Sequence, residues 1–153
     1  GKIEILNSRF HRLFTHNPGG ARWFHGGVYL SSPSIRVAGC RFENTQSLAI
    51  VNSSDAVVCD SAFSCTDEGA YFLNSTHPRV ERNVFDGKNG GKKGIELGGC
   101  IHAEIVHNRF DRLALGVYAR TGSSYGILCG NAFDGCKRRL SAVESKGTAV
   151  ISE

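Results

Sequence analysis

The chain has 153 residues, a formal net charge of +4 and no methionine. This length suits one domain, and no run of 18 apolar residues is present, so no membrane-spanning helix is predicted. The two short basic runs, Lys92-Lys93 and Lys137–Arg139, have no interleaved aromatic residues, which argues against nucleic-acid binding. A mildly basic surface would instead suit an acidic polysaccharide. The six cysteines form no C-x-x-C pair, so no zinc site is predicted, and neither is another metal or cofactor.

One short block recurs along the whole chain. Its anchor is a phenylalanine, at successive spacings of 32, 21, 22, 25 and 23 residues: Phe10, Phe42, Phe63, Phe85, Phe110 and Phe133. A period of this size is typical of a solenoid or an array. Five residues before each anchor stands an apolar, mostly β-branched residue, and two residues before it stands a small or polar turn former. Each unit therefore predicts a short strand, a sharp turn and a second strand.

Further along each unit, a second alternating run predicts another inward-facing strand. We assign its inward positions to Val28 and Leu30, Ala49 and Val51, Tyr71 and Leu73, Ile95 and Leu97, Val117 and Ala119. No stretch has a sustained helical pattern, so parallel strands must follow one another by coiling. Like residues then stack on like about 4.8 Å apart, and Asn83, Asn108 and Asn131 would hydrogen-bond along the axis.

In chain order, six coils are expected, at residues 2–32, 33–54, 55–76, 77–99, 100–124 and 125–147. The first contains a long insertion at 14–27, with Arg22, Trp23 and His25. Loops of this length in a compact repeat are often functional. This one could stack Trp23 on a sugar ring, or it could simply pack over the side of the solenoid. A Gly-rich insertion at 86–94 predicts a mobile loop.

These columns resemble the right-handed parallel β-helix of the pectate-lyase-like superfamily, from Ile3 to about Val143. The resemblance implies an all-β fold, a right-handed parallel β-helix solenoid of about six coils. It implies little about activity, because many functions share this scaffold. Enzymes of the superfamily commonly bind Ca²⁺ through clustered aspartates, whereas here Asp86, Asp111 and Asp134 are spread over three coils.

Chemistry in such a fold must use outward positions, and one charged set stands out. Asp60, Arg82 and His107 occupy the same position on three successive coils, with Glu104 and Arg109 beside them. β-Elimination of a uronic acid needs a cation for the carboxylate, a base for the C5 proton and an acid for the leaving oxygen. Arg82 and Arg109 could hold the carboxylate, with His107 as base or acid and Asp60 and Glu104 completing the catalytic set. The alternative is a solvated face of salt bridges.

Two functions follow from this pattern. The first is a carbohydrate-interacting β-helix domain that acts on an acidic polysaccharide as a lyase or hydrolase, with the Arg22, Trp23 and His25 loop contributing to binding. The second is a non-catalytic scaffold for protein interaction. We expect a single β-helix domain over residues 1–153, excised from a longer β-helix, because neither end carries a cap. Raw sheet edges would favour a homo-oligomer or contact with the rest of that chain, and a secreted or surface location is favoured.

Overall fold

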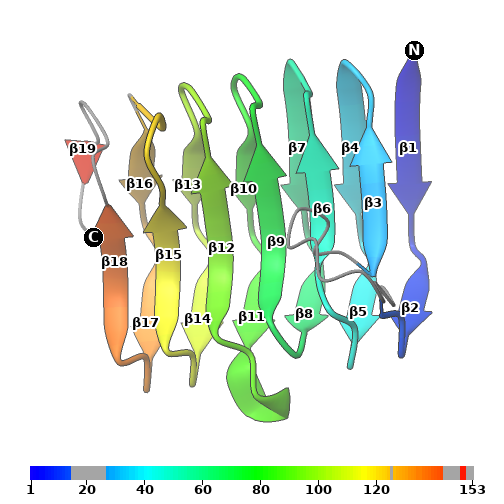
Figure 1. Cartoon of the computed structure of the whole chain (residues 1–153). Coiled ribbons are helices and arrows are strands. Elements are labelled where there is room, and N and C mark those ends of the chain that lie inside the picture. The colour runs from blue at the N-terminus through cyan, green and yellow to red at the C-terminus, as the bar shows by residue number, and fades with distance from the viewer. Residues whose placement is uncertain (15–26, 125, 143–148, 151–153) are drawn as a thin grey trace, which may run out of the picture.

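The computed structural model describes residues 1–14, 27–124, 126–142 and 149–150. Nearly all of its regular structure is short parallel strands, which stack coil upon coil along one axis (Figure 1). The predicted all-β parallel solenoid of about six coils is therefore confirmed. None of the described residues forms a helix long and apolar enough to cross a membrane.

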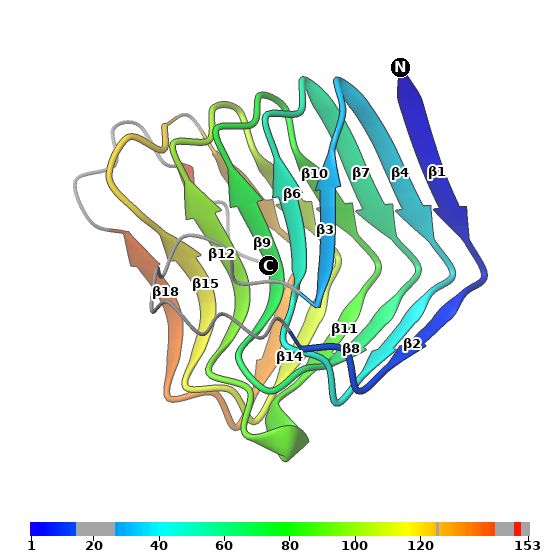
Figure 2. The same cartoon turned by 45° about the vertical axis from the view of Figure 1, so that its right-hand side comes forward.

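Each of the six coils contributes one strand to each of three parallel sheets, which we call A, B and C, and β19 adds a seventh strand to sheet A. Sheet A runs in the order β1 (Lys2–Leu6), β4 (Ser34–Ala38), β7 (Asp55–Cys59), β10 (Arg79–Glu81), β13 (Glu104–Val106), β16 (Ile127–Cys129) and β19 (Ala149–Val150). Sheet B contains β2 (Arg9–His11), β5 (Arg41–Glu43), β8 (Ala62–Ser64), β11 (Val84–Asp86), β14 (Arg109–Asp111) and β17 (Ala132–Asp134). Sheet C contains β3 (Val28–Ser31), β6 (Leu48–Val51), β9 (Glu68–Leu73), β12 (Lys93–Gly98), β15 (Leu115–Ala119) and β18 (Arg138–Ala142). The turned view in Figure 2 shows sheets A and C as separate walls of the solenoid.

The six anchor phenylalanines form one continuous stack inside the solenoid. Neighbouring rings lie nearly parallel, with centroids 4.7 to 5.1 Å apart. The strand register pairs each phenylalanine with the next along sheet B. Phe42, Phe63, Phe85 and Phe110 are almost fully buried. Because this stack fixes the register of sheet B, it also fixes which residues of the flanking turns lie next to one another.

The turn between sheets A and B is held by buried polar side chains. Asn83 Nδ2 donates to Asn108 Oδ1, and Asn108 Nδ2 donates to Asn131 Oδ1, each at 3.1 Å. The same oxygens accept backbone N–H groups of the preceding coil. All six cysteines are free thiols, and Cys40 and Cys100 donate to backbone carbonyls inside the stack. Polar groups in this turn are thereby satisfied within the core.

The insertion at 86–94 is more regular than the predicted mobile loop. It forms a short 3-10 helix, η1 (Gly87–Asn89), and the last two residues already belong to strands, since β12 begins at Lys93. Asp86 caps this helix by accepting the backbone N–H of Lys88 at 2.9 Å. Asn89 Nδ2 then donates to Ser64 Oγ at 2.9 Å, which ties the insertion to the neighbouring coil.

The predicted register of sheet C is wrong in two coils. The core contains Leu48 and Ile50 on β6 and Ala70 and Phe72 on β9. Ala49 pairs with Tyr71, and Tyr71 with Glu96, so these residues lie in one row on the other face of the sheet. Both alternations on β6 and β9 are apolar, and a slip of one residue exchanges the two faces of a strand. The sequence pattern therefore placed Tyr71 and Leu73 inside, whereas they face outward.

Candidate binding groove

The structure brings part of the predicted charged set together. Asp60, Arg82 and His107 occupy the same turn between sheets A and B on three successive coils. All three have left-handed backbone conformations, with φ of 51°, 52° and 55°. Gly130 continues this column, and a Cβ atom there would clash with the His107 ring. The repeat thus stacks these side chains because they share one turn position.

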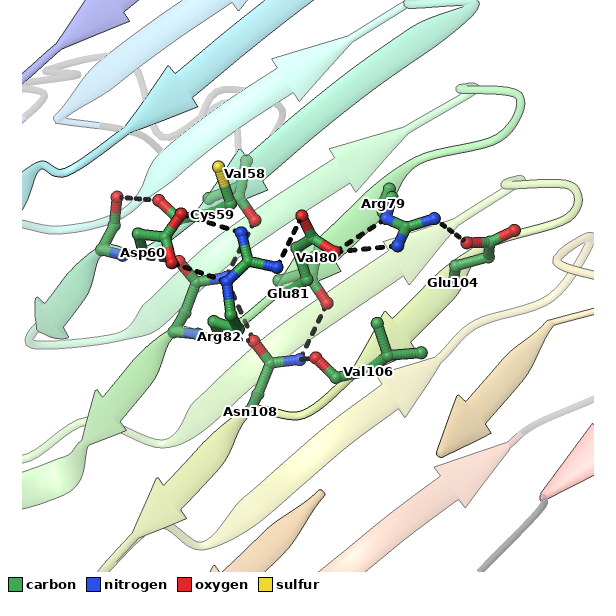
Figure 3. A network of polar contacts seen from close by, with 12 residues as sticks. Val58, Cys59, Asp60, Arg79, Val80, Glu81, Arg82, Glu104, Val106 and Asn108 are labelled. Carbon is green, nitrogen blue, oxygen red and sulfur yellow. Dashed lines mark hydrogen bonds and ion pairs between the residues drawn. The ribbon is translucent and has the colours of Figure 1, made fainter. Parts of the chain in front are cut away.

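The charges of this set are paired with one another in an exposed network (Figure 3). Arg82 donates to both carboxylate oxygens of Asp60, at 2.7 and 3.0 Å, and also contacts Glu81 at 3.0 Å. The hydrogen bonds from Arg82 lower the pKa of Asp60. Arg79 then bridges Glu81 and Glu104, at 2.9 and 2.8 Å. About half of the Arg82 and Asp60 side-chain surface is exposed, so solvent screens these pairs.

Two groups of predicted residues lie elsewhere. Arg109 is on β14 in sheet B, where it binds Asp111 at 2.9 Å, and it takes no part in the Figure 3 network. Arg22, Trp23 and His25 lie outside the described residues. The structure therefore joins Asp60, Arg82 and, through Glu81 and Arg79, Glu104, but it does not gather the full set around one hollow.

A different surface contains a hollow of ligand size. It is a groove of about 710 Å³ on the outer face of sheet C, across β9, β12 and β15. Its lining residues are Glu68, Tyr71, Leu73, Asn74, Lys93, Glu96, Gly98, Gly99, Tyr118, Arg120 and Thr121. Two rows of the sheet register form the floor: Glu68 beside Lys93, and Tyr71, Glu96 and Tyr118 side by side. We call this site the sheet C groove.

Glycine gives the groove its depth. Gly98 lies opposite Leu73 in the register, and a Cβ atom there would be 3.1 Å from the Leu73 side chain and 3.6 Å from the Tyr71 hydroxyl. Deeper in the coil, Gly69 and Gly94 face the rings of Phe85 and Phe110, where a Cβ atom would clash. Glycines at these positions let the phenylalanine stack lie directly beneath the groove.

Four charged side chains alternate along the groove: Glu68 and Glu96 are nearly buried, Lys93 is half-buried and Arg120 is exposed. Lys93 Nζ donates to Glu68 Oε1 at 3.0 Å and to Glu96 Oε2, and it also lies 5.3 Å from the centre of the Tyr118 ring. Arg120 donates to Glu96 Oε1 at 3.2 Å. The side chains of Glu68 and Glu96 are only 9% and 6% exposed. The two Lys93 pairs are better shielded from water than the half-exposed Asp60–Arg82 pair, so their electrostatic interactions are stronger.

Burial shifts the protonation of the groove residues. It raises the pKa of Glu68, and the nearby Asp67 and Glu96 carboxylates raise it further, against the opposing effect of Lys93. Burial also raises the pKa of the Tyr71 hydroxyl. For Lys93, burial opposes the charged form, but the hydrogen bonds to Glu96 and Glu68 prevail and raise the pKa. A cleft with several perturbed groups is the usual mark of a functional site.

The sequence did contain a signal for this groove. Glu68, Lys93 and Leu115 hold equivalent positions just before the glycines Gly69, Gly94 and Gly116, on three successive coils. Aligning those glycines would have placed Glu68 and Lys93 side by side. The phenylalanine anchors could not do so, because the turns between the anchors and sheet C differ in length.

The fold and the groove together define a parallel β-helix protein with an open groove of charged and aromatic side chains on one sheet face. Residues 2–149 match the model of the family described as "Periplasmic copper-binding protein (NosD)", and the chain belongs to this family. Neither the curated proteins nor the solved structures yielded a match.

Proposed function

We propose that this chain is a carbohydrate-binding β-helix domain and that an acidic glycan lies in the sheet C groove. The observation that carries the proposal is the groove itself, in which two tyrosines, two cations and two carboxylates line about 710 Å³. This volume is in the usual range of ligand sites. A surface that runs along successive coils also suits an extended polymer.

The side chains supply the contacts that a sugar acid requires. The rings of Tyr71 and Tyr118 offer apolar surface with a polar hydroxyl at the tip. Arg120 can bind a carboxylate through two N–H groups, which favours a uronic acid over a neutral sugar. Carboxylate oxygens of Glu68 and Glu96 can accept hydrogen bonds from sugar hydroxyls. Each contact type is present on the same wall of the solenoid.

Chain cleavage is the activity that would use the protonatable groups. Both hydrolysis and β-elimination need an acid that protonates the leaving oxygen. Glu68 is the carboxyl group of the groove with the raised pKa, and the carboxylate of Glu96 is held by Lys93 and Arg120. Two carboxyl groups in such different environments fit an acid and an anionic partner.

The family description names copper, and the described residues do not fit this metal. Copper favours thiolate, thioether and imidazole ligands, but the chain has no methionine. Burial raises the pKa of Cys65 to about 12 and that of Cys100 to about 11, which disfavours their thiolates. Among the described residues, no three His, Cys, Asp or Glu side chains are grouped as metal ligands. We therefore assign copper no role here, and take from the family only a location outside the cytoplasm.

One observation favours the second candidate, a protein-interaction scaffold. Several large apolar side chains near the start of the solenoid are exposed: Leu6 by 49%, Leu13 by 38% and Phe14 by 55%. Exposed apolar surface often marks a contact with another protein. A scaffold of this kind would use the first coil and leave the sheet C groove without a ligand.

Binding and turnover of acidic glycans test the first function. Oligogalacturonate, oligomannuronate and hyaluronan fragments would be titrated against the chain, with a neutral gluco-oligosaccharide for comparison. Arg120→Gln should weaken the best acidic ligand at least about tenfold, the usual loss for one charged hydrogen bond. The matched control is Arg112→Gln, since Arg112 is an exposed arginine that binds Asp86.

The same assay separates the groove from the face predicted by sequence. Arg82→Gln should leave affinity unchanged if the glycan lies in the groove, and should abolish binding if the Asp60–Arg82–His107 column is the site. Ultraviolet absorbance of unsaturated products would identify a lyase, and reducing ends without such absorbance a hydrolase. A folded chain that binds none of these glycans would refute the carbohydrate function and leave the scaffold.

A further inference from the structure

One atom of the groove has no hydrogen-bond partner. Glu68 Oε2 is fully buried, and it is the single buried side-chain oxygen or nitrogen of the described residues without a partner. A buried charged oxygen with no donor is costly, whereas a neutral carboxyl group loses much less when buried. A buried polar atom without a partner calls for an explanation in a native protein. Protonation of Glu68 is one explanation, because it removes the negative charge.

The neighbours of Glu68 also oppose its negative charge. Asp67 precedes it in the chain, and Glu96 faces it from β12. The thiol of Cys65 lies on the same turn, but it is uncharged, because burial and, to a smaller extent, the Glu68 charge raise its pKa to about 12. On the opposite side, β6 (Leu48–Val51) carries no titratable residue. Lys93 is the one cation that bonds Glu68 among the described residues, and it shares its ammonium group with Glu96.

The net charge of the groove therefore depends on Glu68. When Glu68 is ionised, Lys93 and Arg120 are balanced by Glu68 and Glu96. Asp67 pairs outside this set with Lys92, at 3.1 Å. When Glu68 is protonated, the two cations exceed the remaining carboxylate by one charge. A single anionic group of a ligand then restores neutrality beside the nearly buried Glu68 and Glu96 side chains, where an uncompensated charge is costly.

We propose that the sheet C groove binds one sugar carboxylate together with one proton, and that Glu68 carries this proton in the complex. This inference rests on the proposed glycan-binding function and adds its regulation by pH. The proton comes from solvent, and no covalent bond is made or broken. The bound anion lies near the two cations, where its charge further favours the neutral form of Glu68.

The sign of the pH dependence follows from this linkage. Binding of the anion takes up a proton whenever Glu68 is ionised in the free protein and neutral in the complex. Within that pH window, affinity should rise about tenfold for each unit by which pH falls. Below the window Glu68 is already neutral in the free protein, so affinity becomes constant until the sugar carboxyl itself titrates, at about pH 3.5 for an ordinary carboxyl beside an electron-withdrawing group.

Calorimetric titration of the whole chain with trigalacturonate tests the proposal between about pH 5 and 8, above the range in which that carboxyl titrates. At each pH the titration would be run in two buffers with different ionisation enthalpies, which gives the number of protons taken up. We expect uptake approaching one proton for each ligand. Glu68→Gln should bind with the low-pH affinity of the original chain and show no proton uptake. Glu43→Gln is the control, because Glu43 is a paired carboxylate on sheet B.

A neutral ligand provides a second measurement that needs no variant. Trigalacturonate with its carboxyl groups reduced to alcohols should bind without proton uptake and without the rise in affinity at low pH. Binding of the acidic sugar with no proton uptake at any pH would overturn this inference and leave the proposed function intact. Absence of binding of the acidic sugar at every pH would overturn both.

Discussion

Replacing Lys93 by methionine tests whether the groove charges depend on one another. The substitution keeps an unbranched apolar side chain of similar length and removes the ammonium group. Lys93 Nζ bonds both Glu68 Oε1 and Glu96 Oε2. After the substitution Glu96 retains Arg120, whereas Glu68 loses its only side-chain partner among the described residues. We expect this loss to dominate the change in stability.

The size of the effect follows from burial. Breaking a buried ion pair by removing one partner costs about 3–5 kcal/mol. Lys93 is 26% exposed, while both carboxylates are nearly buried. Glu68 can also lose its negative charge by taking up a proton, which reduces the cost of losing its partner. We therefore expect Lys93→Met to lower the free energy of unfolding by about 2–3 kcal/mol at pH 7, which is just below that range.

The pH dependence has a definite sign. The pKa of Lys93 is raised in the folded protein, so its stabilisation is complete below the ordinary lysine pKa of about 10.4 and is lost as pH rises through the folded value. The difference in free energy of unfolding between the original chain and Lys93→Met should thus become smaller at strongly alkaline pH. It should narrow on the acid side too, because protonated carboxyl groups no longer need the ammonium.

Urea unfolding followed by far-ultraviolet circular dichroism measures this difference. Lys92→Met is the matched control: Lys92 is 67% exposed and pairs with Asp67, so its loss should cost at most about 0.5 kcal/mol. The reasoning fails if the two variants unfold at the same urea concentration, because the groove charges would then contribute no more to stability than exposed charges do.

Three further predictions concern the framework. Asn108→Ala should lower stability by about 3 kcal/mol, because it removes the acceptor of the buried Asn83 backbone N–H and one of the two acceptors of Asn83 Nδ2; an unchanged urea midpoint would contradict this. Gly94→Ala should cost about 1–3 kcal/mol, since its Cβ would meet the Phe110 ring, and differential scanning calorimetry would reveal the lower Tm. Burial raises the pKa of Cys65 to about 12, so iodoacetamide at pH 8 should alkylate the partly exposed Cys129 well before Cys65. Mass spectrometry of a time course decides between them, and equal rates would show that Cys65 is accessible.

The sequence predicts sheets A and B well, for a physical reason. In these sheets the inward residue is large or β-branched and its neighbours are polar, as in Arg36-Val37 or Arg109-Phe110. Only one assignment of faces is then compatible with a dry core. Because each phenylalanine stacks on the next, an assignment made in one coil extends to the others.

For sheet C the sequence pattern does not select one assignment of faces. Along β9 both Ala70 with Phe72 and Tyr71 with Leu73 are apolar alternations, so the pattern does not distinguish the two faces. The outward residues are apolar or nearly buried because they line a groove, and a groove wall resembles a core position in sequence. The predicted site was consequently placed on the turn at Asp60 and Arg82, where charges are easy to recognise, rather than on Glu68, Lys93 and Glu96.

Comparison of the two charged surfaces explains why the groove is the stronger candidate. In the Arg82 network every side chain except Glu81 is about half exposed, so the pairs cost little to form and contribute little, and such networks arise readily on any solvated face. Burying Glu68 and Glu96 next to Lys93 carries a large desolvation cost that apolar side chains in the same rows would avoid. Leu115, which occupies the Lys93 position on the next coil, shows that the fold accepts such a residue there. Folding alone does not require these charges, and binding of a charged ligand gives a physical reason for them.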